Sequence, residues 1–243
     1  MKRKHWLLLG LMGCLTAIVF WPAYALKQPL AQATNGRLQL LNAQGTIWSG
    51  QATLGVSSGT QVQTLPGLIN WKPLFFRDEA LLGMSLSHPN LTQDLNVGVN
   101  SSGTAVTAGQ ARLPASWLSA LGAPFNTIQP EGELQLAWDQ INSESGTLSL
   151  EIVWRDAQST LSSVRPLGEY RAVLTGRLGE TLHLDLSTTQ GALHVEGKGQ
   201  IVPGKRMQFQ GFAWATEQSK PALRGILSQM GQPQNGRYRL NFF

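Results

Sequence analysis

The sequence predicts a mainly β protein built from antiparallel strands, and three observations support that prediction. Apolar residues recur at every second position along several segments, such as residues 134–138, 148–154 and 182–186. Turn sequences such as PGLIN, ESGT and QNGR return about every ten residues. Charged residues make up only 14% of the chain, which holds 26 glycines and 8 tryptophans. Alternation of this kind gives each strand one apolar and one solvated face, as in antiparallel sheets.

Two short helices are expected to interrupt the strands. The first covers about residues 114–121 and ends at Gly122, with a proline beyond. The second covers about residues 221–230, has apolar residues at helical spacing, and ends at Gly231.

The segments around these helices resemble each other. Each helix is followed by a short loop and a strand that begins at glycine, GELQLAW in one case and GRYRLNFF in the other. We interpret this as a weak internal duplication with β-rich halves at about residues 36–139 and 146–243. The halves would form either a curled sheet or a sandwich.

The N-terminal region predicts a membrane anchor. Residues 6–26 carry no charge, and a helix of that length, at about 1.5 Å per residue, just crosses a hydrocarbon core of about 30 Å. Residues 1–5 would form a cytoplasmic basic tip, and residues 27–243 a periplasmic domain. The charges that orient the anchor are Lys2, Arg3 and Lys4, and its interfacial aromatic residues are Trp6, Trp21 and Tyr24.

A cleaved signal peptide is the alternative for this segment. The sequence AYA, ending at Ala25, satisfies the small-x-small rule for signal peptidase. Cys14, the single cysteine, lies within the apolar run, so the exported domain is expected to be held together without disulfides.

The net charge argues against a nucleic-acid partner. The chain carries 19 basic and 14 acidic residues, a net charge of +5, and three of the basic residues lie in the first four positions. The remainder of the chain is therefore close to neutral, and its basic residues are scattered singly rather than clustered.

Signatures of catalysis are missing from the sequence. It contains no HExxH motif, Walker loop or GxGxxG opening a helix. We therefore expect no catalytic residue, no cofactor and no enzymatic activity.

One cluster of titratable residues is suggestive of a metal site. A hairpin turning at residues 189–190 would place His183 opposite Glu196 and Asp185 opposite His194. These types of residue bind metals, but cross-strand charge pairs on a solvated face account for them equally simply. We therefore predict no metal site.

The stretch GTIWSGQATL contains no titratable group. Gly45 is expected in the turn that enters a strand. Gly50 would leave a space on the apolar face, suited to a bulge, a bend or the close approach of the Trp48 ring.

Exposed aromatic residues are the expected contacts with partner proteins. Phe75 and Phe76 in NWKPLFF are the candidates, and the alternative is that they are ordinary core residues at a strand end.

Taken together, the basic-flanked anchor and the phrases GTIWSGQA, WRDAQSTL, PLGEYRAVLTG and FQGFAWA resemble the N component of the type II (general) secretion pathway. The resemblance covers nearly the full chain. It implies a single-pass inner-membrane protein with a periplasmic β-rich domain. It also implies an accessory, non-catalytic role beside other secretion components that export folded proteins across the outer membrane. By this resemblance the fold-defining positions are Gly45, Trp48, Gly50, Pro166, Leu167, Gly168 and Tyr170.

A second function stays open on the residues alone. The many Trp and Leu side chains on one face exceed what a simple sandwich needs. This favours, as the alternative, a periplasmic lipid-binding module with an open hydrophobic β-trough.

Overall fold

A computed structural model of the chain describes residues 11–13, 16–57, 62–77, 80–100, 103–122, 125–205 and 207–242. The predicted orienting charges at positions 2–4 and Trp6 lie outside these residues. None of the described helices is long and apolar enough to span a bilayer. The anchor over residues 6–26 therefore stays a prediction.

The mainly β, antiparallel fold is confirmed. The strands of the N-terminal part are β1 (Leu38–Gly45), β2 (Gly50–Ser57), β3 (Val62–Thr64), β4 (Ile69–Arg77), β5 (Ala80–Ser87), β6 (Leu95–Asn100), β7 (Gly103–Val106) and β8 (Gly109–Pro114). Those of the C-terminal part are β9 (Pro130–Trp138), β10 (Ile141–Asn142), β11 (Thr147–Ser159), β12 (Gly168–Arg177), β13 (Leu182–Gly191), β14 (Leu193–Ile201), β15 (Gln208–Ala215), β16 (Gln232–Gln234) and β17 (Arg237–Phe242).

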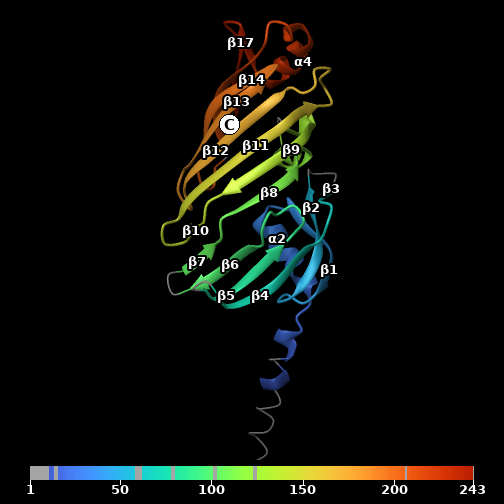
Figure 1. Cartoon of the computed structure of the whole chain (residues 1–243), viewed down its shortest axis with the longest axis vertical. Coiled ribbons are helices and arrows are strands. Elements are labelled where there is room, and N and C mark those ends of the chain that lie inside the picture. The colour runs from blue at the N-terminus through green and yellow to red at the C-terminus, as the bar shows by residue number, and fades with distance from the viewer. Residues whose placement is uncertain are drawn as a thin grey trace, which may run out of the picture.

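Nearly every strand pairs with its neighbour in sequence. The first sheet has the order β1-β2-β4-β5-β6-β7-β10, with β3 added beside β2. The second sheet has the order β16-β17-β15-β14-β13-β12-β11-β9-β8. Figure 1 shows the result as a long meander, in which the colour passes from blue at one end to red at the other.

The two sheets meet where the β7–β10 pair of the first sheet continues into the β8–β9 pair of the second. Gly109 in β8 pairs with Trp138 in β9, and Val106 in β7 pairs with Ile141 in β10. The segment from β7 to β8 and the segment from β9 to β10 therefore each skip two residues at the same place, and pairing resumes in the same register. An isolated bridge between Leu91 and Ala111 adds a second connection.

Helices lie against both ends of the meander. The 3-10 helix η1 (Ala23–Leu26) and helix α2 (Lys27–Ala33) pack on β1, and α4 (Lys220–Met230) packs on β15 and β17. The 3-10 helix η2 (Ala115–Leu121), followed by α3 (Phe125–Ile128), packs on β9 and also touches β2.

Both predicted helices are present, with one difference. The segment 115–121 is a 3-10 helix, and Gly122 follows it at φ +86°. Helix α4 ends at Gly231, as predicted. Helix α2 was not predicted, because KQPLAQA has no repeated apolar stripe and contains a proline.

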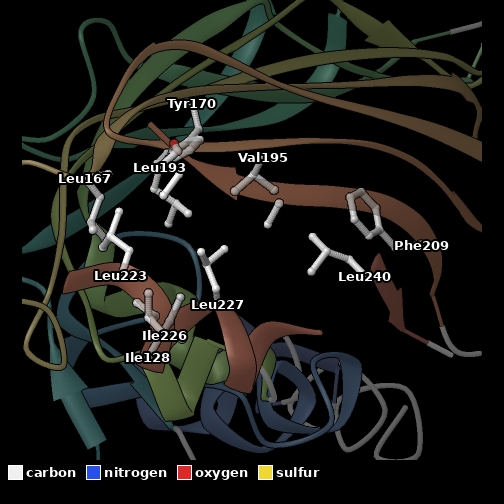
Figure 2. Packing of buried hydrophobic residues seen from close by; sticks show 13 residues of the cluster. Ile128, Leu167, Tyr170, Leu193, Val195, Phe209, Leu223, Ile226, Leu227 and Leu240 are labelled. Atoms are coloured by element: carbon white, nitrogen blue, oxygen red, sulfur yellow. Dashed lines mark hydrogen bonds between the residues drawn. The ribbon is translucent and has the colours of Figure 1, made fainter. Parts of the chain in front are cut away.

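The main core lies between α4 and the second sheet. Leu223, Ile226 and Leu227 of α4 face Leu193 and Val195 of β14 (Figure 2). All five side chains are buried. At roughly 1.5–3 kcal/mol for each fully buried aliphatic side chain, this contact is what holds the helix on the sheet.

The predicted register of the β13–β14 hairpin is wrong by four residues. Asp185 pairs with Lys198, and His183 with Gln200, because β13 continues to Gly191 before the chain turns. The backbone of Gly191 has φ +133°, and a Cβ there would lie 2.2 Å from the Cα of Gly168. Close packing of these two glycines across β12 and β13 moves the turn beyond residues 189–190.

Candidate functional site

The turn between β1 and β2 holds the end of the N-terminal segment. The backbone N–H of Ile47 donates to the carbonyl of Trp21 at 2.9 Å, and Trp48 Nε1 donates to the carbonyl of Ile18 at 2.9 Å. Pro22 forms a β-bridge with Thr46. The motif residue Trp48 therefore connects the sheet to the segment before it, in a role that the sequence did not suggest.

The last residues of the predicted anchor are part of this contact. Ala23 is buried to 1% exposure against the first sheet. Trp21 and Tyr24, predicted as interfacial aromatics, are 51% and 64% exposed. No flexible linker separates residue 18 from the first strand in the described structure.

The space at Gly50 is filled by a ring, one of the three alternatives expected there, but the ring is that of Trp71 and not of Trp48. A Cβ on Gly50 would lie 2.6 Å from Cζ2 of Trp71. Trp71 Nε1 donates to the carbonyl of Thr46 at 3.0 Å, which fixes the ring against the turn. Gly45 lies at the start of that turn with φ +87°, a conformation that suits glycine.

Of the motif in residues 166–170, Leu167, Gly168 and Tyr170 are buried at the main core, whereas Pro166 is exposed. Leu167 is buried, and its carbonyl accepts hydrogen bonds from the backbone N–H groups of Ala192 and Leu193. Tyr170 Oη donates to the carbonyl of Leu193 at 2.9 Å, and burial raises the pKa of this phenol. Gly168, which follows Pro166 and Leu167, leaves no room for a Cβ because the carbonyl of Gln190 lies 2.6 Å from that position.

Phe75 is exposed, not part of the core. It lies in β4 opposite Leu82 of β5, which in turn lies opposite Val99 of β6. The three side chains are 59%, 48% and 50% exposed. Directly paired residues lie on one face of a sheet, so Phe75, Leu82 and Val99 form one continuous apolar row, the exposed row.

The exposed row is the uncovered end of an otherwise covered face. Trp71 shares the face of Phe75 on β4 and is buried against Ala23, with Leu86 packed beside it. Helix α2 and η1 cover that end, whereas no described helix covers the exposed row. The side chain of Phe76, the second predicted contact, lies outside the described part of the structure.

Leu82 and Val99 were missed by sequence reasoning. Both occupy alternating apolar positions and look like ordinary core residues. Only the register, which places them beside Phe75 beyond the reach of α2, shows that they are exposed.

The titratable residues of the predicted cluster are dispersed into separate pairs. Lys198 Nζ lies 3.6 Å from Asp185 Oδ2, and Arg237 lies 3.1 Å from Glu196 Oε1. His194 stacks on Trp214 at 5.2 Å between ring centroids. In the described ranges, no group of three or more His, Cys, Asp or Glu residues is placed to hold a metal ion.

Two hollows of about 460 and 480 Å³ occur in the described structure, and polar side chains dominate their lining. The first surrounds Gly50 and Trp71, with Gln51 and Asn70 beside them. The second has the same kind of composition around Gly109. No histidine or cysteine lines either hollow. Ser85, in the lining of the first, donates its hydroxyl to Asp94 Oδ2 at 3.3 Å.

Comparison with known proteins identifies the family. The family model of the type II secretion system protein N matches residues 36–241, which is most of the chain. The chain belongs to the type II secretion system protein N family. No curated protein and no solved structure matches it. Membership makes this type II secretion protein a component of the secretion apparatus, and the resemblance noted from its sequence phrases is confirmed.

The matched region begins at residue 36 and so contains both features described above. The turn that holds the N-terminal segment and the exposed row are parts of the family domain itself. Residues 18–23, which that turn contacts, precede the matched region.

Proposed function

We propose that this type II secretion protein is a non-catalytic accessory component that is anchored in the inner membrane and contacts other secretion subunits from the periplasm. The observation that carries the proposal is the exposed row of Phe75, Leu82 and Val99 on a domain of the secretion family. Contiguous exposed apolar side chains are uncommon on soluble proteins. Where they occur, they often mark a contact surface.

The position of the row relative to the anchor supports this role. Trp48 and Ile47 fasten the segment that ends at Trp21 directly to the first sheet. Fixing the domain to a membrane segment without a linker would hold the row at a set height and orientation. Attachment to the same membrane raises the local concentration of the domain for its partners.

The test is co-purification of the full chain from cells that contain the complete secretion apparatus. We expect wild-type protein to retain other type II secretion subunits, and the double variant Phe75→Ala with Leu82→Ala to lose them. Truncating a residue that is a hot spot of an interface costs more than about 1 kcal/mol, or roughly fivefold or more in affinity. The control is Leu178→Ala, since Leu178 is 52% exposed but lies in the turn between β12 and β13, away from the exposed row.

Thermal unfolding of the same variants separates binding from folding. Because Phe75 and Leu82 are exposed, their loss should leave the unfolding midpoint almost unchanged. If the double variant unfolds the domain, or if it retains all partners, the row is not the contact surface.

A further inference from the structure

The second sheet presents one face that carries no charge over many strands. On β11 this face contains Leu148, Leu150 and Ile152, and on β12 it contains Ala172 and Leu174. Cross-strand pairing continues it through β13 and β14, with Leu182, Leu184, Leu186, Gly197, Gly199 and Ile201. We call this set of eleven side-chain positions on β11–β14 the aliphatic face.

The charged residues of these strands all occupy the opposite face. Glu151, Arg171, Asp185 and Lys198 each alternate with members of the aliphatic face along the same strand. They form ion pairs with each other there, Arg171 with Glu151 and Lys198 with Asp185. The separation of apolar from charged side chains is therefore complete over these four strands.

Leu184 and Leu186 of the aliphatic face pack against the core under α4, and the members on β11 and β12 lie beyond that core. The buried residues under α4 are on other positions, such as Tyr170, Leu193 and Val195 (Figure 2). Leu150, Leu174 and Leu182 are only half-buried, and the described helices pack chiefly on β1, β9, β15 and β17. The sheet thus continues as an apolar surface past the end of its own core.

We propose that the aliphatic face binds the acyl chains of a phospholipid. The face has no charged and no hydrogen-bonding side chains, and this favours an acyl chain as its ligand. A protein interface carries about one hydrogen bond per 100–200 Å², whereas a hydrocarbon chain needs none. A surface without charges or hydrogen-bond donors is therefore complementary to a hydrocarbon chain.

The dimensions agree with this occupant. At about 3.4 Å per residue, the face extends about 14 Å along β11 from Leu148 to Ile152. One leaflet of a bilayer, half of a hydrocarbon core of about 30 Å, has an acyl chain length of about 15 Å. On β14 the ring of Phe209, which is buried in the main core, lies over Gly197 and Gly199 and closes the face at that end.

This inference goes beyond the role in secretion and does not depend on the exposed row. The tested positions lie on different strands from Phe75, so loss of partner capture and loss of lipid can be observed separately. Either result can occur without the other.

The test uses a photo-reactive benzoylphenylalanine placed in the full chain within living cells. Leu174 and Val173 are adjacent on β12, are both half-buried and lie on opposite faces, which makes them a matched pair. We expect irradiation to attach a phospholipid at position 174, detected as added mass after purification under denaturing conditions, and no such adduct at position 173. Position 150 is expected to behave as position 174, since Leu150 pairs with Leu174.

Three results would overturn the proposal. These are equal lipid attachment at positions 173 and 174, attachment of a protein at 174 in place of lipid, and no attachment at 174 or 150. A measurement on the unmodified chain covers the case in which the labelled proteins fail to fold. After exhaustive exchange into lipid-free detergent, native mass spectrometry should show at least one phospholipid retained per chain. A chain that retains none contradicts the proposal.

Discussion

The ring of Trp138 occupies the space that a side chain on Gly109 would need. A Cβ on Gly109 would lie 2.5 Å from Cζ2 of Trp138, and Trp138 Nε1 donates to the carbonyl of Thr107 at 2.9 Å. Trp71 has the same relationship to Gly50, with a hydrogen bond to Thr46. A glycine, a tryptophan on the paired strand and a threonine carbonyl thus form the same unit once in each sheet.

Substituting either glycine should destabilise the fold by displacing a tryptophan ring. We expect Gly50→Ala and Gly109→Ala each to lower the free energy of unfolding by about 1–3 kcal/mol, the usual cost of overpacking. Urea unfolding followed by tryptophan fluorescence measures this, and the fluorescence also reports the environment of the displaced indole. Unchanged unfolding midpoints would show that the rings move aside without cost.

A third glycine should respond in the opposite direction. Gly225 lies within α4, and a Cβ there would meet nothing within 4 Å. Gly225→Ala is therefore expected to stabilise the protein by about 0.5–1 kcal/mol, because alanine loses less backbone entropy in a helix. A rise in the urea midpoint is the expected result, and a fall would mean that α4 is packed more tightly at this point than the structure shows.

The hydroxyl group of Tyr170 should contribute to the free energy of unfolding. Tyr170→Phe removes the hydrogen bond to the carbonyl of Leu193 and leaves a buried acceptor without this donor. The expected loss is about 1 kcal/mol of unfolding free energy. Burial raises the pKa of Tyr170 above its ordinary value of 10, so the unfolded chain ionises first.

The consequence for Tyr170 is a specific dependence on alkaline pH. The stabilisation is fully present below pH 10 and is lost as the pH rises above it. Tyr170→Phe should lack this part of the alkaline loss when unfolding is measured between pH 8 and pH 11. A variant with the wild-type alkaline profile would exclude Tyr170 as the titrating group.

From the buried ring of His88 we expect the stability of the fold to decrease at acidic pH. It is buried, its Nδ1 accepts the backbone N–H of Asn90 at 3.0 Å, and its Nε2 has no partner in the described structure. Burial lowers the pKa of His88 from its ordinary value of 6.5. The unfolded chain therefore takes up the proton first, and stability falls as the pH decreases below 6.5, by at most about 1.4 kcal/mol per pH unit.

An asparagine at this position separates the titration from the hydrogen bond. His88→Asn keeps an acceptor near the N–H of Asn90 but cannot be protonated. The variant should show a smaller loss of stability between pH 6.5 and pH 5 than the wild type. An NMR titration of the His88 ring checks the cause directly, and a midpoint at or above 6.5 would refute it.

Local pattern predicted the strands well, but not how they pair. Leu148, Leu150 and Ile152 alternate with polar residues in the sequence, and they lie on one face of β11 as expected. The register of β13 against β14 failed because it depends on Gly168 and Gly191, which meet across two strands. A contact between residues so far apart leaves no trace in the period of a single strand.

The candidate contact surface was only half predictable, for a similar reason. Phe75 was singled out by its aromatic neighbours in the sequence, but an apolar residue in a strand is normally in the core. Its exposure follows from the place where η1 and α2 end on the first sheet, and Leu82 and Val99 become exposed together with it. How much of a sheet face a helix covers depends on the tertiary structure, so the sequence pattern of a single strand does not show it.

The pairing of strands with their sequence neighbours has a consequence for how the protein acquires its structure. In a meander each ladder closes a short loop, so the contact order is low for an all-β protein, and low contact order favours rapid folding. A chain that emerges gradually from its N-terminus could add one hairpin at a time to an existing edge. Helix α4 would then pack on β15, and β16 and β17, which follow it in the chain, would complete the second sheet.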